Sequence, residues 1–228
     1  MRPVRHADSP AAPTARHRRT GRIRPRRDLV GGLMARGLIL ASASPQRKKL
    51  LKSLRVPFRI IPADIPEDSA QKRPQRLTVQ LALRKARAIA ARHPKALVLG
   101  ADTVVVCRGV ILGKPRDRKE SSDILQALNG RWHRVYTGVA LIDGATKKVW
   151  RAVVTSRVKA RRLRPEDLQR FVGRHMDKAG AYAVQDHGDP FIERIEGPVD
   201  NVIGLPMTCV RDLLRRACRS RAKPTEGR

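Results

Sequence analysis

The chain is predicted to fold as an α/β protein, because apolar strand patterns and helix patterns alternate along it. A short apolar run over residues 38–42 leads directly into a helix pattern over 45–54. A second strand pattern over 57–62 precedes a long helix pattern over 74–92, and another apolar strand follows over 96–106. Strands that alternate with helices in this way form a sheet against which the helices pack.

The first helix has a clear start signal. Ser44 can cap it through the side-chain hydroxyl, and Pro45 suits the first helical position, where no amide hydrogen is needed. Leu50, Leu51 and Leu54 supply an apolar face. We therefore expect a helix that begins at Pro45 and docks on the first strand.

The long helix over 74–92 is amphipathic. We expect its apolar residues to face inward, namely Leu77, Leu81, Ala82, Ala88 and Ile89. We expect its basic residues elsewhere on its surface, namely Arg84, Lys85, Arg87 and Arg92.

The rest of the domain is predicted to hold a hairpin and three more helices. A turn at Arg108-Gly109 ends the strand over 96–106. The hairpin joins strands 132–142 and 148–160 through Asp143-Gly144, a pair that is typical of tight turns. The helices run from about Asp117 to a left-handed cap at Asn129-Gly130, from Pro165 onward, and from about Leu205 to Ala217.

Both ends of the chain differ from this pattern. Residues 1–36 are Arg-rich and lack apolar periodicity, so we expect a disordered basic extension, with Met34 as a candidate translation start. Residues 219–228 are predicted to form a polar tail. The folded domain is therefore expected over 37–218.

Charge and composition exclude several classes of protein. The formal net charge of +30 predicts salt-sensitive, non-specific contacts with nucleic acids and other polyanions. Aromatic residues make up only 3% of the chain, and no zinc-finger or RNP-like pattern is present, so no sequence-reading nucleic-acid module is indicated. No stretch approaches the roughly 20 apolar residues that cross a membrane, and no apolar signal region follows the basic N-terminus, so we expect a cytoplasmic protein. The cysteines, Cys107, Cys209 and Cys218, are odd in number and widely spaced, which favours reduced thiols over a disulfide framework or a zinc site.

The start of the first helix is a candidate phosphate site. Free amide groups and the helix dipole favour an anion there, and Arg47, Lys48 and Lys49 add full positive charges. The alternative is an ordinary capped helix with a solvated basic face.

Asp102 lies inside the apolar strand over 96–106, where an unpaired charge is costly. It therefore needs a cation, a metal or a catalytic task, although a structural ion pair with an arginine is an alternative. Gly100 and Ala101 are small enough to let a ligand approach the backbone.

Further polar groups lie in three loops. Lys114, in a glycine-proline turn, is a point charge that suits a phosphate oxygen. Asp64 and Glu67 form an acidic island, so Glu67 and Asp102 can share a divalent cation if the fold brings them together. Gln185 follows a segment of small residues and offers the paired donor and acceptor that can read a base edge.

Four of these segments resemble the motifs of the Maf family of nucleoside triphosphate pyrophosphatases, in the family's order. The likeness spans about residues 37–217. The segments are Ser42-Ala43-Ser44-Pro45, Gly100 to Val105, Leu112 to Pro115, and Asp177 to Tyr182.

The resemblance implies a mixed sheet with flanking helices around a deep cleft between two lobes, often in a homodimer. It also implies hydrolysis of a nucleoside triphosphate between the α and β phosphates, with Asp102 as general base and Mg²⁺ or Mn²⁺ held by Glu67 and Asp102. The remaining residues that it assigns to substrate binding are Ser42, Ser44, Arg47, Lys85 and Lys114.

Within the family, base choice is associated with the positions of Gln46, Thr103 and Gln185. Thr103 and Gln185 are similar to the group that prefers dTTP and UTP. Gln46 departs from the usual arginine, and Pro66 stands where the common D-x-D-E pattern has its second aspartate.

Two other functions fit the sequence. One is a house-cleaning pyrophosphatase that acts on non-standard purine nucleotides or on 7-methyl-GTP. Thr103 and Gln185 favour a pyrimidine base and therefore count against it. The other is a non-catalytic protein that binds polyanions through the positive surface that a net charge of +30 provides.

Overall fold

The computed structural model describes residues 36–184 and 191–220. Seven strands form one mixed sheet in the order β2-β1-β3-β5-β6-β7, and β4 pairs with β3 off this path. Among the described strands, β1 pairs in parallel with β2 and with β3, and the other pairs are antiparallel. The strands are β1 (Leu38–Leu40), β2 (Phe58–Ile60), β3 (Leu97–Cys107), β4 (Val110–Leu112), β5 (Trp132–Asp143), β6 (Val149–Ala160) and β7 (Ile192–Glu196). The predicted α/β class is confirmed.

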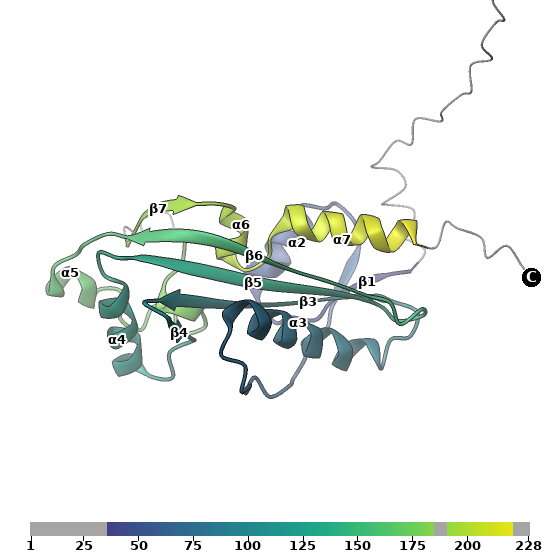
Figure 1. Ribbon diagram of the computed structural model, residues 1–228, viewed down its shortest axis with the longest axis horizontal. Helices are drawn as coiled ribbons and strands as arrows, with labels where there is room; N and C mark the ends of the chain where they lie inside the picture. Colours follow the sequence, from purple (N-terminus) through teal and green to yellow (C-terminus); the bar gives the residue numbers. More distant parts are fainter. Residues whose placement is uncertain (1–35, 185–190, 221–228) are drawn as a thin grey trace, which may run out of the picture.

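Helices cover both faces of this sheet (Figure 1). They are α2 (Pro45–Lys52), α3 (Pro74–Ala90), α4 (Arg118–Leu128), α5 (Pro165–Gln169), α6 (Val199–Ile203) and α7 (Met207–Arg219), with a short 3-10 turn η1 (Ala179–Ala181). Leu38 and Leu40 pack in one core cluster with α7, whereas Ile39 packs in another with α3. This alternation follows from the two-residue period of a strand, which sends successive side chains to opposite faces.

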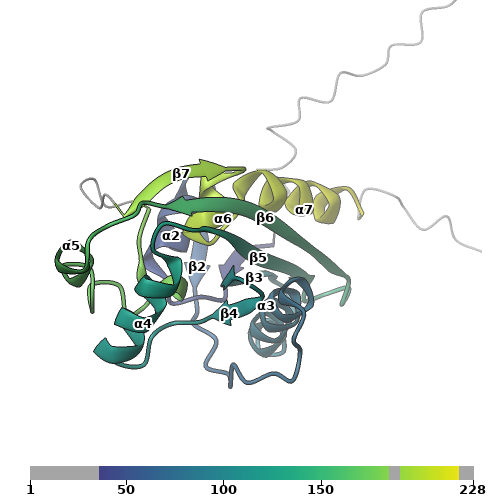
Figure 2. The ribbon, with the colours of Figure 1, turned by 60° about the vertical axis from the view of Figure 1, so that its left-hand side comes forward.

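The long strands carry a second core beyond the end of β1. Leu125 and Leu128 of α4 pack there with Phe171, Tyr182 and Phe191. Figures 1 and 2 show α4 and α5 at the end of β5 and β6 that lies away from β1. The sheet therefore joins two lobes, each with its own core, as the resemblance implied.

Helix α3 packs unusually close to the sheet. A Cβ atom at Gly100 would collide with the backbone of Ala82, and one at Gly138 would collide with the backbone of Thr78. The expectation that Gly100 lets a ligand approach the backbone is therefore wrong, because α3 takes that space.

Several elements were not predicted from the sequence. These are β4, η1, β7 and α6, and the last helix begins at Met207 rather than near Leu205. At the start of the described chain, Arg36 pairs with Asp143 at 3.2 Å and donates a hydrogen bond to the carbonyl of Ala217. Most of the predicted extension and tail lies outside the described residues. Among the helices that the structure describes, none is long and apolar enough to span a membrane.

Candidate active site

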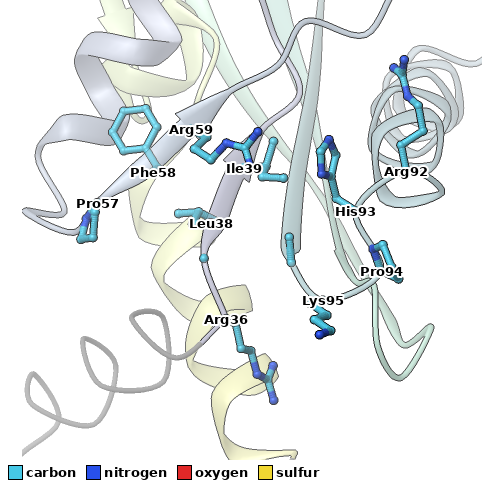
Figure 3. A pocket seen from close by; sticks show the side chains of 12 residues that line it. Arg36, Leu38, Ile39, Pro57, Phe58, Arg59, Arg92, His93, Pro94 and Lys95 are labelled. Atoms are coloured by element: carbon cyan, nitrogen blue, oxygen red, sulfur yellow. The ribbon is translucent and has the colours of Figure 1, made fainter.

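Two cavities of similar size open at different places on the sheet. One, of about 510 Å³, lies where β1 and β2 begin, and Leu38, Pro57 and Phe58 form its apolar part (Figure 3). Its rim carries Arg59 and Lys95, and its lining includes neither a carboxylate nor a motif residue. The other, of about 530 Å³, is lined by residues from all four motifs. The second cavity is the candidate site, and we call it the cleft.

The cleft opens at a gap in the hydrogen bonding of β3. On one edge, β3 pairs with β5 from Leu97 to Val106. On its other edge it pairs with β1 only up to Leu99, and with β4 only from Val105 onward. Among the described strands, none pairs with this edge over residues 100–104. Leu97 and Leu99 bond toward the β1 side, so strand alternation turns the peptide groups of Ala101 and Thr103 toward the gap.

The start of α2 forms one wall of the cleft. The Ser44 hydroxyl accepts a hydrogen bond from the Arg47 backbone at 3.4 Å and donates to the Gln46 side chain at 3.2 Å. Ser42 Oγ accepts from the Ser44 backbone at 3.2 Å. The predicted cap at Ser44 and the proline in the first turn are confirmed. Anion binding at this helix end stays a prediction.

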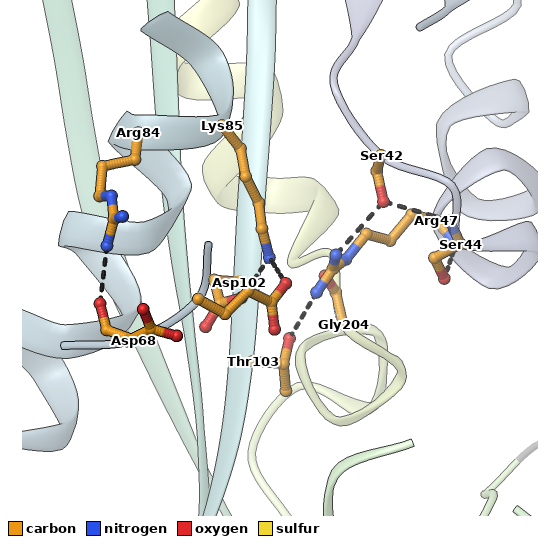
Figure 4. Close-up of polar contacts among 10 residues, drawn as sticks. Ser42, Ser44, Arg47, Asp68, Arg84, Lys85, Asp102, Thr103 and Gly204 are labelled. Carbon is orange, nitrogen blue, oxygen red and sulfur yellow. Dashed lines mark hydrogen bonds and ion pairs between the residues drawn. The ribbon is translucent and has the colours of Figure 1, made fainter. Parts of the chain in front are cut away.

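Arg47 reaches across the cleft to two other elements. Its Nε donates to the carbonyl of Gly204 at 2.9 Å, its Nη1 to Ser42 Oγ at 3.3 Å, and its Nη2 to Thr103 Oγ1 at 3.1 Å (Figure 4). All of these partners are neutral. Burial lowers the pKa of the Arg47 guanidinium, and the charges of Asp102 and Glu67 act in the opposite direction. The guanidinium is thus fixed in place while its charge stays available to an anion.

Lys85 joins the two predicted metal-ligand carboxylates. Its Nζ lies 2.6 Å from Asp102 Oδ1 (Figure 4). The same Nζ lies 2.6 Å from Glu67 Oε1. The expectation that Lys85 lies on the helix surface is wrong, since the residue is only 8% exposed. The fold therefore brings Glu67 and Asp102 to one point, and a lysine of α3 is the cation between them. An ion pair was an open alternative for Asp102, but the partner is a lysine of the cleft rather than an arginine.

The two carboxyl groups differ in their electrostatics. Burial raises the pKa of Asp102 above its ordinary value, and the charge of Lys85 only partly counters that effect. Burial also acts to raise the pKa of Glu67, but the hydrogen bond and charge of Lys85, together with Lys114 and Arg47, outweigh it, so the net pKa is lowered. Asp102 is therefore the stronger base of the pair, as suits a group that takes up a proton.

The other predicted site residues are distributed around the cleft. Lys114 lines it from the turn after β4 and is exposed, so its ammonium is open to a ligand. Thr103 lines it from β3 and is half-buried. Asp64 is exposed and is not among the lining residues. Gln185 lies outside the described residues.

Sequence reasoning missed several polar groups behind the cleft wall. Thr137 of β5 lies opposite Thr103, with 2.9 Å between their hydroxyl oxygens, and donates to the carbonyl of Asn201 at 2.8 Å. His133 lies further along β5, with its Nε2 at 2.9 Å from the hydroxyl of Tyr182, which lines the cleft. Thr137 had a signal in the sequence, because it interrupts the mainly apolar run over 135–142. His133 had no such signal, because the charged Arg134 follows it.

The fold and the cleft define an α/β protein whose site combines a buried carboxylate with several cations, an arrangement suited to phosphorylated ligands. A family model described as Maf-like protein matches residues 37–217, and the chain belongs to the Maf family.

Named relatives match most of the chain. The chain is 46% identical over 178 residues to the dTTP/UTP pyrophosphatase of Elusimicrobium minutum, covering 78% of this chain and 97% of the relative. It is 45% identical to the dTTP/UTP pyrophosphatase of Pelotomaculum thermopropionicum, covering 78% of this chain and 95% of the relative. Among solved structures, that of the Staphylococcus aureus Ham1 protein aligns with a TM-score of 0.47 and 12% identity, covering 79% of this chain and 99% of that one.

Proposed function

We propose that this protein hydrolyses dTTP and UTP between the α and β phosphates, giving the nucleoside monophosphate and pyrophosphate. Family membership and the names of the relatives support nucleotide pyrophosphatase activity. The observation that carries the proposal is the buried Asp102, paired with Lys85 in a cleft that residues of all four motifs line.

In this mechanism, Asp102 takes a proton from the water that attacks the α-phosphorus. Lys85 binds only Oδ1 of Asp102, so Oδ2 is available to orient the water. The raised pKa of Asp102 makes it a better proton acceptor than an exposed carboxylate. Because phosphoryl chemistry depends mainly on positioning and on neutralising charge, one base and a few cations suffice.

The cations would neutralise the triphosphate and the pyrophosphate that leaves. The hydrogen-bond partners of the Arg47 guanidinium are neutral, and Lys114 is exposed to solvent. Both positive charges can therefore interact with phosphate groups. Ser42 and Ser44 line the same wall, beside the start of α2, where a phosphate oxygen is favoured by the helix end.

The carboxylates fit a divalent cation that arrives with the nucleotide. Glu67 and Asp102 both contact the ammonium group of Lys85, so their oxygens already lie close to one positive charge. Mg²⁺ commonly binds one or two carboxylates together with substrate phosphates. Across the described ranges there is no group of three or more His, Cys, Asp or Glu side chains that could hold a metal alone. Glu67 and Asp102 would hold Mg²⁺ or Mn²⁺, which when bound withdraws charge from the phosphate oxygens.

We assign the choice of pyrimidine to Thr103, with Gln185 as its counterpart from the segment after Tyr182. Thr103 lines the cleft and is anchored on two sides, by Arg47 and by Thr137. Gln46 also lines the cleft, and its side chain bonds to Ser44. We also propose a homodimer and a cytoplasmic location, where the three free cysteines would stay reduced.

The experiment is pyrophosphate release from dTTP, UTP, CTP, ITP, GTP and 7-methyl-GTP, with Mg²⁺ or Mn²⁺. We expect dTTP and UTP to lead, and Asp102→Asn to lose turnover by several orders of magnitude while remaining folded. Asp123→Asn is the matched control, because Asp123 forms an exposed pair with Lys119 on α4 and lies outside the cleft. An Asp102→Asn variant that keeps most of its turnover would refute the base assignment, and preferential release from purines would refute the substrate.

A further inference from the structure

A chain of hydroxyl groups behind the cleft has only one possible direction of hydrogen bonding. Thr137 is fully buried, and its Oγ1 lies 2.8 Å from the carbonyl oxygen of Asn201. A carbonyl oxygen only accepts, so the single hydroxyl proton of Thr137 is committed to Asn201. Thr137 must therefore accept in its other contact, which is the one at 2.9 Å with Thr103.

The same reasoning fixes Thr103. Its single hydroxyl proton is donated to Thr137, while it accepts from Arg47 Nη2 at 3.1 Å, and a guanidinium has only donors. A hydroxyl oxygen has two lone pairs, so one acceptor position remains on Thr103. The bonds thus run from Arg47 through Thr103 and Thr137 to Asn201, and Thr103 offers the cleft an acceptor but no donor.

We propose that Thr137 is a positioning residue for base choice, because it holds the Thr103 hydroxyl as an acceptor that selects the N3–H of uracil or thymine over the bare N3 of cytosine. This inference rests on the proposed function, in which Thr103 reads the base. N3–H is the ring donor shared by uracil and thymine, whereas N3 of cytosine carries a lone pair that would oppose the lone pair of Thr103. Thr137 is fully buried and is not among the cleft-lining residues, so it would act on the base only through Thr103.

The test is Thr137→Val, which keeps the shape of the side chain and removes the hydroxyl. The proton of Thr103 is then free to point into the cleft and to donate to cytosine N3. We expect the ratio of UTP to CTP in kcat/KM to fall about tenfold, the factor that corresponds to about one net hydrogen bond. The change should come mainly from better use of CTP. Thr137→Ser keeps the hydroxyl and should retain the wild-type ratio.

A double variant separates this role from a structural one. In a Thr103→Val background no hydroxyl is left to orient, so adding Thr137→Val should leave the ratio unchanged. A ratio that still shifts in this background would overturn the proposal, as would an unchanged ratio in the single variant. Thermal melting checks that each variant is folded, and Thr137→Ala, which also removes the hydroxyl, replaces the valine variant if that one unfolds.

Binding of UMP and CMP by calorimetry gives a second readout that needs no turnover. Wild-type protein that prefers UMP, and loses this preference in Thr137→Val, supports the inference even where hydrolysis of UTP fails and the proposed reaction is wrong. Turnover of UTP without any preference over CTP, in the wild type, overturns the inference while leaving the reaction intact. Wild-type protein that binds neither nucleotide and releases no pyrophosphate from UTP or CTP overturns both.

Discussion

The buried histidine of β5 gives a quantitative test of the fold around the cleft. His133 is only 3% exposed, and burial lowers its pKa from 6.5 to about 4, while the backbone of Arg131 acts more weakly in the opposite direction. The ring lies edge-on to Tyr182, with 5.4 Å between centroids, and so holds a cleft-lining segment against the sheet. Protonation of His133 must therefore oppose folding.

The sign and size follow from proton linkage. The folded pKa is lower than the unfolded one, so the unfolded state binds the proton more tightly and stability is lost as pH falls from about 6.5 toward 4. A shift of this size corresponds to about 3 kcal/mol in full. Between pH 7 and pH 5 the linkage relation gives a loss of about 2 kcal/mol, a large share of the roughly 5–15 kcal/mol typical of a domain.

The perturbation is His133→Gln, whose amide can still reach the Tyr182 hydroxyl but does not titrate in this range. Urea unfolding is followed by the fluorescence of Trp132 and Trp150, which lie on β5 and β6. We expect the wild type to lose about 2 kcal/mol more than the variant between pH 7 and pH 5. Tyr182→Phe should keep the wild-type pH dependence, because burial and not the phenol hydroxyl lowers the pKa. Equal losses in the wild type and His133→Gln would refute the reasoning.

Two further predictions concern the cleft. Lys85→Gln removes the charge that counters the burial of Asp102, so the pKa of Asp102 should rise further. Since the base must be ionised, the acid limb of the pH–rate profile should move to higher pH, and an unmoved limb in steady-state assays would contradict the role of Asp102 as base. Gln46→Arg should change base preference or substrate affinity with the chemical step intact, because Gln46 lines the cleft but lies on another element from Asp102. Identical kinetics on every nucleotide would remove Gln46 from the specificity argument.

The features that the sequence predicted well are those with local causes. Ser44 and Pro45 mark the start of α2 because a cap and a first-turn proline need only their immediate neighbours. Asp102 was found because a carboxylate inside an apolar strand is anomalous wherever that strand packs. The motifs then identified the family, which the match over residues 37–217 confirmed.

The features that were missed depend on contacts between distant segments. β7 pairs with β6 across more than 30 residues of sequence, and nothing within Ile192–Glu196 encodes that partner. Lys85 is different, because its signal was present in the sequence. It stands four residues after Leu81 and four before Ile89, on the same stripe of α3, so its burial follows from the helical period. A lysine within the apolar stripe of a helix, like an aspartate within an apolar strand, indicates a buried charge that needs a partner or a function.

The unpaired edge of β3 explains why groups from distant motifs meet in one place. The strand is long enough to serve both lobes, but β1 leaves it after Leu99 and β4 joins it only at Val105. Between these points the edge of β3 is unpaired among the described strands and borders the cleft, next to the end of β1 where the chain turns into α2. Asp102 and Thr103 lie in this unpaired part of β3 and line the cleft. β5 and β6 run through both lobes as twelve-residue strands, so the two lobes share one continuous sheet. Lys85 and Arg47 are held in the cleft by contacts within the protein, and fixed charges are the kind that contribute most to stabilising a transition state, which agrees with the roles proposed for them.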